Sequence, residues 1–268
     1  MKIHINILIL IILPSLIFSQ NGSKLFMRVQ YSVTAHEDLG KKRTDDWMYL
    51  DIGKNESVYY SYFNHIRDST VQSQKQMGYN AFEIMENLKG TKRGSKDVFL
   101  FYSNNKNLNH YSVITADYYM VTESIGEIKW NISNETTSIL NYKCFKATAY
   151  FKGRQWTVWF TQDIPIKSGP WKLNGLPGLV LRASDSEKHY TFECMAIGKI
   201  DKTLQMSDYS KYSSVSKKEF DMLLNKFKTN PLVVLDNKGV TIGVAKDANG
   251  RVIDVKQKMK TQYNPIER

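Results

Sequence analysis

Histidine, cysteine and carboxylate side chains could do chemistry in this chain, but their spacing matches no familiar catalytic or metal-binding motif. Beyond His4, the histidines are far apart, at His36, His65, His110 and His189. The sequence has no His-x-x-x-His pair, no Cys-x-x-Cys pair, no phosphate-binding glycine loop and no nucleophile elbow. We therefore predict no metal, no cofactor and no catalytic residue from the sequence. Whether the protein is an enzyme stays open, and a non-catalytic role is favoured.

Two polar arrangements between residues 154 and 170 have a structural explanation. Ser168 precedes Gly169-Pro170, and this dipeptide favours a turn over a nucleophile. Asp163 and Arg154 could form an ion pair that ties a loop to a hairpin. No carboxylate pair suited to glycoside chemistry stands out among Glu123, Glu127 and Glu135.

The two cysteines, Cys144 and Cys194, leave two alternatives open. An oxidising compartment favours a disulfide between them. The alternation of apolar and polar residues opposes it, because Cys194 falls on the apolar set of its strand and Cys144 on the polar set. A disulfide between neighbouring strands requires both side chains on one face.

The composition is typical of packed strands, with 16 Tyr, 12 Phe and 5 Trp among 268 residues. The formal net charge of +11 comes from scattered groups at 41–43, 89–96 and 256–260. A nucleic-acid site would need such charges on one face, so we expect no nucleic-acid partner. A weak attraction to acidic lipid or glycan surfaces fits the charge better.

Alternating residues predict a series of β-strands. These are 26–33, 47–52, 58–63, 98–102, 111–115, 118–122, 127–132, 142–151, 154–161, 179–183 and 190–200. The segment 69–88 reads as partly helical. The clearest feature is the hairpin of 142–151 and 154–161, whose core face comprises Phe145, Ala147, Ala149, Phe151, Trp156, Val158 and Phe160.

A helix is predicted near 216–229. Ser216 and Glu219 match a capping box, and an apolar stripe follows at Phe220, Leu223, Leu224 and Phe227. Asn230-Pro231 ends the helix. The segments 240–245 and 251–255 predict a last hairpin at the C-terminal end.

Residues 1–19 have the features of a cleavable signal peptide: a positive start, an apolar stretch and a small residue at the cut. We expect the mature chain, 20–268, to form one β domain. No cysteine lies near the cut, so the protein is expected in the periplasm or outside the cell, without a lipid anchor. We expect no transmembrane segment after cleavage.

A loop rich in glycine and proline, 162–178, is the most densely marked part of the sequence. Its residues, with Trp159 of the hairpin, could form a ligand or protein site: Trp159, Trp171, Gly175, Leu176, Pro177 and Gly178. The alternative is a rigid corner that caps the open end of a sheet, with Trp171 and Leu176 as plugs. Six residues are assigned to the structural part of the motif: Cys144, Arg154, Trp156, Asp163, Gly169 and Pro170.

Gly175-Leu176-Pro177-Gly178-Leu179-Val180, together with the motif residues upstream of it, resembles the signature of the GLPGLI family of exported bacterial envelope proteins. Val180 stands where the family has isoleucine. The similarity covers about a fifth of the chain, from Trp130 to Ala183. It implies an envelope location and no particular activity.

We expect a mainly β fold, in which one curved antiparallel sheet or open half-barrel carries one or two packed helices. The leading functional hypothesis is a binding or carrier module for an apolar ligand or a protein partner. An envelope hydrolase and an accessory protein of an outer-membrane transport or secretion system remain as alternatives.

Overall fold

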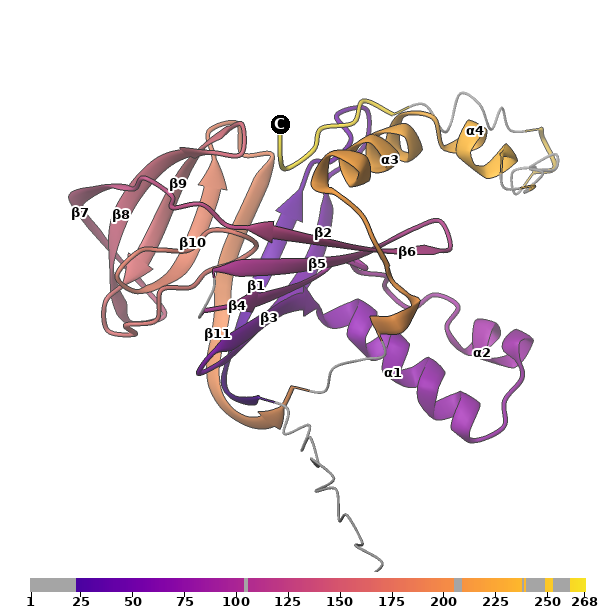
Figure 1. Ribbon diagram of the computed structural model, residues 1–268, viewed down its shortest axis with the longest axis horizontal. Helices are drawn as coiled ribbons and strands as arrows, with labels where there is room; N and C mark the ends of the chain where they lie inside the picture. The colour runs from indigo at the N-terminus through magenta and orange to yellow at the C-terminus, as the bar shows by residue number, and fades with distance from the viewer. Residues whose placement is uncertain (1–22, 104–105, 205–208, 238, 240–248, 253–260) are drawn as a thin grey trace, which may run out of the picture.

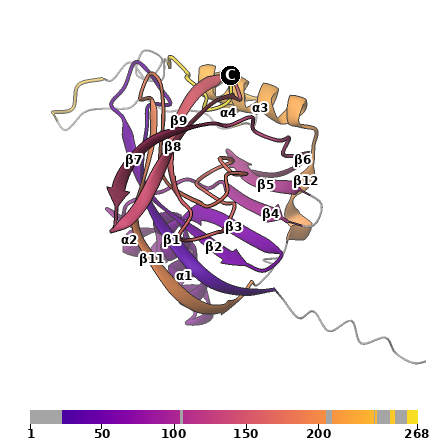
Figure 2. The ribbon, with the colours of Figure 1, turned by 90° about the vertical axis from the view of Figure 1, so that its left-hand side faces the viewer.

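A computed structural model describes residues 23–103, 106–204, 209–237, 239, 249–252 and 261–268. Twelve strands form one sheet in the order β12-β6-β5-β4-β3-β2-β1-β11-β10-β9-β8-β7. Neighbouring strands are antiparallel, except for β12 and β6, which are parallel. The predicted fold class is confirmed: the sheet curves into an open half-barrel (Figures 1 and 2).

The first six strands are β1 (Lys24–Ala35), β2 (Thr44–Gly53), β3 (Glu56–Ser61), β4 (Val98–Tyr102), β5 (Asn107–Ile114) and β6 (Asp117–Ser124). The other six are β7 (Asn131–Ile139), β8 (Tyr142–Phe151), β9 (Arg154–Thr161), β10 (Leu179–Asp185), β11 (Tyr190–Thr203) and β12 (Ser213–Ser214). The helices are α1 (Tyr62–Gln76), α2 (Ala81–Asn87), α3 (Lys217–Thr229), α4 (Pro231–Asp236) and the 3-10 turn η1 (Tyr209–Lys211).

The main core fills the inside of the half-barrel. Every second residue of the central strands points into it, which buries Val29, Tyr31 and Val33 of β1 and Met48, Leu50 and Ile52 of β2. The predicted β8–β9 hairpin is confirmed in extent and register, with Ala149 opposite Trp156. Trp156, Val158 and Phe160 are buried as predicted, while Phe145 and Phe151 are half-buried at the edge of the core.

Some predicted boundaries are wrong. The strand expected at 127–132 begins only at Asn131, and a backbone bond from Trp130 N to Ile128 O makes a tight turn before it. The strand expected to reach Phe63 stops at Ser61. The Ser61 hydroxyl accepts the backbone N–H of Asn64, which caps α1 and starts the helix there.

The helices lie on two sides of the sheet. Near the start of α1, Tyr62 packs against Trp47, which faces the opposite side from the buried Met48 of β2. The rest of α1 runs away from the sheet with α2 beside it (Figure 1). The predicted helix α3 lies over the other side, capped by Ser216, and buries Phe220 against the sheet. The described residues thus contain more helices than the one or two expected.

The predicted signal peptide, 1–19, lies outside the described residues, and so do 240–245 and most of 251–255 of the predicted last hairpin. Among the residues that are described, no helix has both the length and the hydropathy needed to cross a membrane.

Candidate functional site

The glycine- and proline-rich loop between β9 and β10 folds into the half-barrel. Trp171, Leu173 and Leu176 are all buried in the main core. The ring of Trp171 packs against Trp156 at 5.6 Å and against Phe151 at 5.8 Å between centroids. This position accords with a structural role for Trp171 and Leu176 as plugs of the barrel.

The glycines of the loop are needed for its backbone path. A Cβ at Gly178 would lie 1.9 Å from the carbonyl oxygen of Thr161, and one at Gly169 would lie 2.3 Å from that of Leu173. Gly175 has φ +91°, a conformation that glycine adopts without strain. The spacing of glycines in the motif therefore reflects close backbone contacts.

The residues assigned to a ligand site from the sequence are not brought together. Leu176 and Gly178 are buried, and Gly175 and Pro177 are exposed at the surface. Trp159 is half-buried and packs against the edge of the main core. Among the six, Trp171 alone lines the cavity described below.

Arg154 has a different partner from the one that the sequence suggested. Asp163 is exposed, and the guanidinium of Arg154 is buried against Asp185, the last residue of β10, with Nη1 2.6 Å from Oδ2. The ion pair with Asp163 that the sequence left open is therefore not formed, because the buried carboxylate of Asp185 binds the guanidinium instead. The other N–H groups of Arg154 donate to Asn264 Oδ1 and to backbone carbonyls of residues 265 and 266.

Arg154 thus holds the 261–268 segment against the sheet. Tyr190 donates its hydroxyl to Asn264 O at 2.6 Å, and Asn264 donates its side-chain amide to His36 O at 2.8 Å. At the end of the segment, the Arg268 N–H donates to Lys152 O in the β8–β9 turn. The segment is hydrogen-bonded at several points along its length, so its position against the sheet is fixed.

A cavity of about 480 Å³ lies between the inside of the sheet, α3 and the 261–268 segment. Aromatic rings from six parts of the chain line it: Tyr59, Phe99, Trp171, Phe192, Phe220 and Tyr263. The loop 93–96, which precedes β4, also contributes. A Cβ at Gly94 would collide with the Ser61 hydroxyl and the Asp46 carboxylate, so glycine lets this loop lie against β2 and the end of β3.

His110 and Asp97 form one polar part of the cavity lining, which also includes charged residues such as Asp46, Lys217 and Glu267. His110 Nε2 lies 3.0 Å from Asp97 Oδ1, and the imidazole stacks on Phe99 at 4.4 Å. Ser95 donates its hydroxyl to Asp97 Oδ2 at 2.9 Å, and Ser112 also hydrogen-bonds this carboxylate. The side chain of Asp97 remains 40 % exposed toward the cavity.

Burial by itself would raise the pKa of Asp97, but its hydrogen bonds with His110, Ser112 and Ser95 and the nearby charge of His110 lower it below the usual range. Asp97 is therefore ionised at neutral pH. The two hydroxyls bond the carboxylate rather than the imidazole, which is not the order of a nucleophile–histidine–acid triad. The arrangement suits recognition of a donor group on a ligand.

A second group of charges closes the cavity beside Trp171. The ammonium of Lys172 has no exposed surface and is bonded to Glu123 and Glu267. Lys152 and Lys217 contact Glu267 at 3.2 Å each. Burial opposes ionisation of Glu267, but the three ammonium groups outweigh it and lower its pKa to about 2. These ion pairs attach the 261–268 segment to the loop that plugs the barrel.

Both cysteines are buried and unpaired in the structure, so the disulfide left open by the sequence is not formed. Cys144 lies on β8 and Cys194 on β11, with β9 and β10 between them. Three strand spacings of about 4.8 Å each separate the two backbones along the sheet, well beyond the reach of one bridge.

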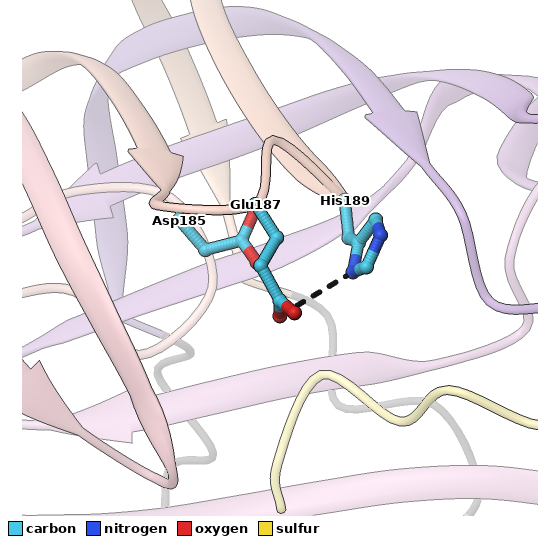
Figure 3. Close-up of side chains that lie close together, drawn as sticks. All are labelled: Asp185, Glu187 and His189. Carbon is cyan, nitrogen blue, oxygen red and sulfur yellow. Dashed lines mark ion pairs between the residues drawn. The ribbon is translucent and has the colours of Figure 1, made fainter.

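Asp185, Glu187 and His189 are the described residues whose side chains could hold a metal ion, with ligand atoms within 4.8 Å of one another (Figure 3). Their oxygens are already engaged. Asp185 accepts from Arg154 and from a backbone N–H, and Glu187 lies 2.5 Å from Arg268 and 3.5 Å from His189. Two guanidinium groups occupy the position of a cation, so this cluster is an ion-pair network.

Comparison with protein families shows which family the chain belongs to. The family described as N-glycanase peptide, N-terminal domain matches residues 56–227, about two thirds of the 268 residues. The chain belongs to this family. Among curated proteins, none matches the sequence.

One solved structure among those compared supports the fold. This structure, of PNGF-II in space group P21, has a TM-score of 0.51 and 16% identity over 76% of this chain and 34% of that chain. A second, in space group C2, has a TM-score of 0.48 and 16% identity over 75% and 33%. The chain thus spans about a third of the PNGF-II length. A LolA superfamily protein from Nitrosomonas europaea has a TM-score of 0.26 and 8% identity over 70% and 90%, too low to establish a shared fold.

The sequence motifs did not identify His110 and Asp97, the polar pair in the cavity, as candidate site residues. His110 lies on the inward side of β5 with Leu108 and Ser112, and Asp97 precedes β4. The signal available was the parity of β5, because a histidine and a serine share the set of positions that contains the buried Leu108 and Ile114. The partnership of His110 with Asp97 needs the β4–β5 pairing, which no spacing in the sequence reveals.

Proposed function

We propose that this chain is a binding module whose cavity holds one small amphipathic molecule. The observation that carries the proposal is the cavity of about 480 Å³ inside the half-barrel, lined by aromatic rings and by polar groups that include His110 and Asp97. Its size falls within the range of small-molecule sites, which are mostly apolar with a few placed polar groups.

The walls of the cavity are held in place, which favours a site that binds a ligand over a channel that a ligand passes through. The 261–268 segment and the Trp171 loop are attached by the buried charges of Arg154 and Lys172, so the inner wall is preorganised. The ligand that fits has an apolar body, to contact Phe99 and Phe192, and a hydrogen-bond donor or cation, to meet the ionised Asp97.

Titration with a dansyl-labelled long-chain amine tests this proposal. The dansyl emission should rise and shift to the blue on binding to the wild type. Ala35 lines the cavity, so Ala35→Trp should fill it and raise the Kd by about tenfold or more, which is about 1.4 kcal/mol. Ala81→Trp is the matched control, because Ala81 is exposed on α2, and its Kd should not change. Equal affinities of the wild type and Ala35→Trp would contradict a site in this cavity.

We also propose that the protein is exported to the periplasm or beyond without a lipid anchor, and that it is a GLPGLI-type protein. The supporting features are the apolar start of the chain and the absence of cysteine near residue 19. Intact-mass analysis of protein from the envelope fraction should give a chain that starts near Gln20. A mass that includes residues 1–19 or a lipid would contradict this.

Hydrolysis of a glycoconjugate is the second candidate function. The family description names an N-glycanase, and His110 and Asp97 lie within hydrogen-bond distance inside a cavity. Incubation of the whole chain with a glycopeptide, followed by chromatography of released glycans, tests it. Release by the wild type that is lost in both His110→Gln and Asp97→Asn would replace the binding proposal with a catalytic one.

A further inference from the structure

The hydroxyl of Tyr59, a residue of β3, is a buried polar group for which the described part of the chain supplies no partner. Tyr59 is 2% exposed, and its hydroxyl makes no hydrogen bond with any described residue. A buried hydroxyl without a partner costs free energy, and most buried polar groups of folded proteins are hydrogen-bonded. Tyr59 lines the cavity described above, so a molecule in the cavity can supply the missing partner.

Tyr31 on β1 shows how the same side chain is satisfied nearby. Its ring packs against that of Tyr59, with centroids 6.5 Å apart, and it has no exposed surface. The Tyr31 hydroxyl donates to Val180 O at 2.7 Å. Tyr31 is not among the described residues that line the cavity. Of these two neighbouring and almost equally buried tyrosines, the one that borders the cavity is the one whose hydroxyl lacks a partner.

Tyr59 belongs to a row of three rings on the inner side of adjacent strands. It lies opposite Phe99 in the β3–β4 register, and Phe99 lies opposite His110 in the β4–β5 register. The ring centroids are 6.2 Å apart for Tyr59 and Phe99 and 4.4 Å apart for Phe99 and His110. Asp97 lies beside His110 at the far end of the row. The row therefore presents a hydroxyl donor, then an apolar ring, then an ionised carboxylate.

The phenol of Tyr59 is protonated at neutral pH. Burial raises its pKa well above the ordinary value, and the charge of the Asp46 carboxylate raises it further. The oxygens of Asp46 accept from the Ser61 hydroxyl and from the backbone N–H of Ser95. The Tyr59 hydroxyl thus has a proton to donate, and no described residue accepts it.

We propose that the Tyr59 hydroxyl donates a hydrogen bond to an uncharged oxygen of the ligand and thereby determines which ligands the cavity accepts. This role rests on the binding function proposed above. The ligand then carries a cation or donor for Asp97, an apolar middle for Phe99 and an acceptor for Tyr59. Two strand spacings separate Tyr59 from His110, so the polar ends of the ligand are on the order of 10 Å apart. A ligand without the acceptor is disfavoured, because the buried donor stays unpaired.

Competition between two ligands tests the role of Tyr59. Octylamine and ω-aminooctanol differ by one terminal hydroxyl, and each is used to displace the dansyl-labelled amine, whose own Kd is measured first for every variant. Tyr59→Phe removes only the phenolic hydroxyl. It should weaken the binding of ω-aminooctanol by about three- to tenfold and leave the Kd of octylamine within about twofold of the wild type. The change in the ratio of the two Kd values isolates the hydrogen bond.

Tyr31→Phe is the matched control, because it removes the hydroxyl of the neighbouring ring outside the cavity lining. It should leave both Kd values unchanged and lower the melting temperature by about 2–4 °C, since Val180 O loses its donor. Tyr59→Phe should not lower the melting temperature, because it breaks no hydrogen bond within the fold.

Three results would overturn the role of Tyr59 and leave the binding function intact. The first is an equal change, or no change, in the affinities of the two amines when Tyr59 is replaced. The second is a failure of both amines to displace a dansyl amine that does bind. The third is a melting temperature of Tyr59→Phe as low as that of Tyr31→Phe, because the hydroxyl would then be bonded within the fold. If the dansyl amine does not bind the wild type, the binding function and the role of Tyr59 fail together.

Discussion

The two halves of the half-barrel differ in what surrounds their buried polar groups. In the half formed by β7–β11, the guanidinium of Arg154 meets a carboxylate, an amide and two backbone carbonyls. In the half formed by β2–β6, Asp97 is bonded by His110, Ser95 and Ser112 but still faces the cavity. Polar groups whose partners are all supplied by the chain maintain the fold, and polar groups that face a cavity can bind a ligand.

The motif of the sequence lies in the first half. Its glycines, tryptophans and Arg154 are used for backbone contacts, core packing and attachment of the 261–268 segment. The cavity residues of the second half come from strands, a loop and α3, and share no motif. Four substitutions test this difference between the halves, and they are given in order of decreasing effect.

Arg154→Ala should have the largest effect. It would leave Asp185 buried without its cation and release Asn264, so we expect the free energy of unfolding to fall by about 3–5 kcal/mol. Urea unfolding followed by tryptophan fluorescence measures it. Asp163→Ala is the control, because Asp163 is exposed, and it should change stability by less than about 0.5 kcal/mol. If both variants lost a similar amount of unfolding free energy, Arg154 would be paired with Asp163 and not with Asp185.

Glu267→Gln should come next, with a loss of about 2–3 kcal/mol at neutral pH, because Lys172 would keep only Glu123 as a charged partner. The pKa of Glu267 is about 2 when folded, against an ordinary value of 4.5. Its ionisation therefore stabilises the fold above about pH 4.5, and this contribution is lost as the pH falls toward 2. Urea midpoints measured between pH 7 and pH 3 should decrease less steeply for Glu267→Gln than for the wild type. Parallel curves would contradict the role of Glu267.

Much of the fold could be predicted from the sequence, because the fold depends on local patterns. Alternation located most strands, and Ser216 located the start of α3. The register β1–β11 joins residues far apart in the chain, so the order of strands in the sheet could not be derived. The cavity was beyond prediction for the same reason, since Phe99, Trp171 and Tyr263 meet only after the sheet has closed around the loop.

Gly175→Ala should have a moderate effect of about 1–2 kcal/mol, because φ at this position is +91° and the residue is exposed. Gly126→Ala is the control: a Cβ at Gly126 would meet no atom within 4 Å, and its φ is not positive, so stability should stay near that of the wild type. Differential scanning calorimetry gives the two melting temperatures. If Gly175→Ala instead weakens binding of the dansyl amine and leaves stability intact, the motif takes part in the site after all.

His110→Gln should have the smallest effect on stability, about 1 kcal/mol or less, although His110 is almost as buried as the core residues around it. A glutamine can still donate to Asp97, and the cavity beside the ring can admit water to the remaining polar atoms. The binding of the dansyl amine should be affected far more, because both the stacked ring beside Phe99 and the orientation of Asp97 change. Measured together, the unfolding free energy and the Kd separate the two halves: Arg154→Ala should lose stability first, and His110→Gln should lose affinity first. A loss of stability from His110→Gln as large as that from Arg154→Ala would mean that the polar groups of both halves serve the fold alone.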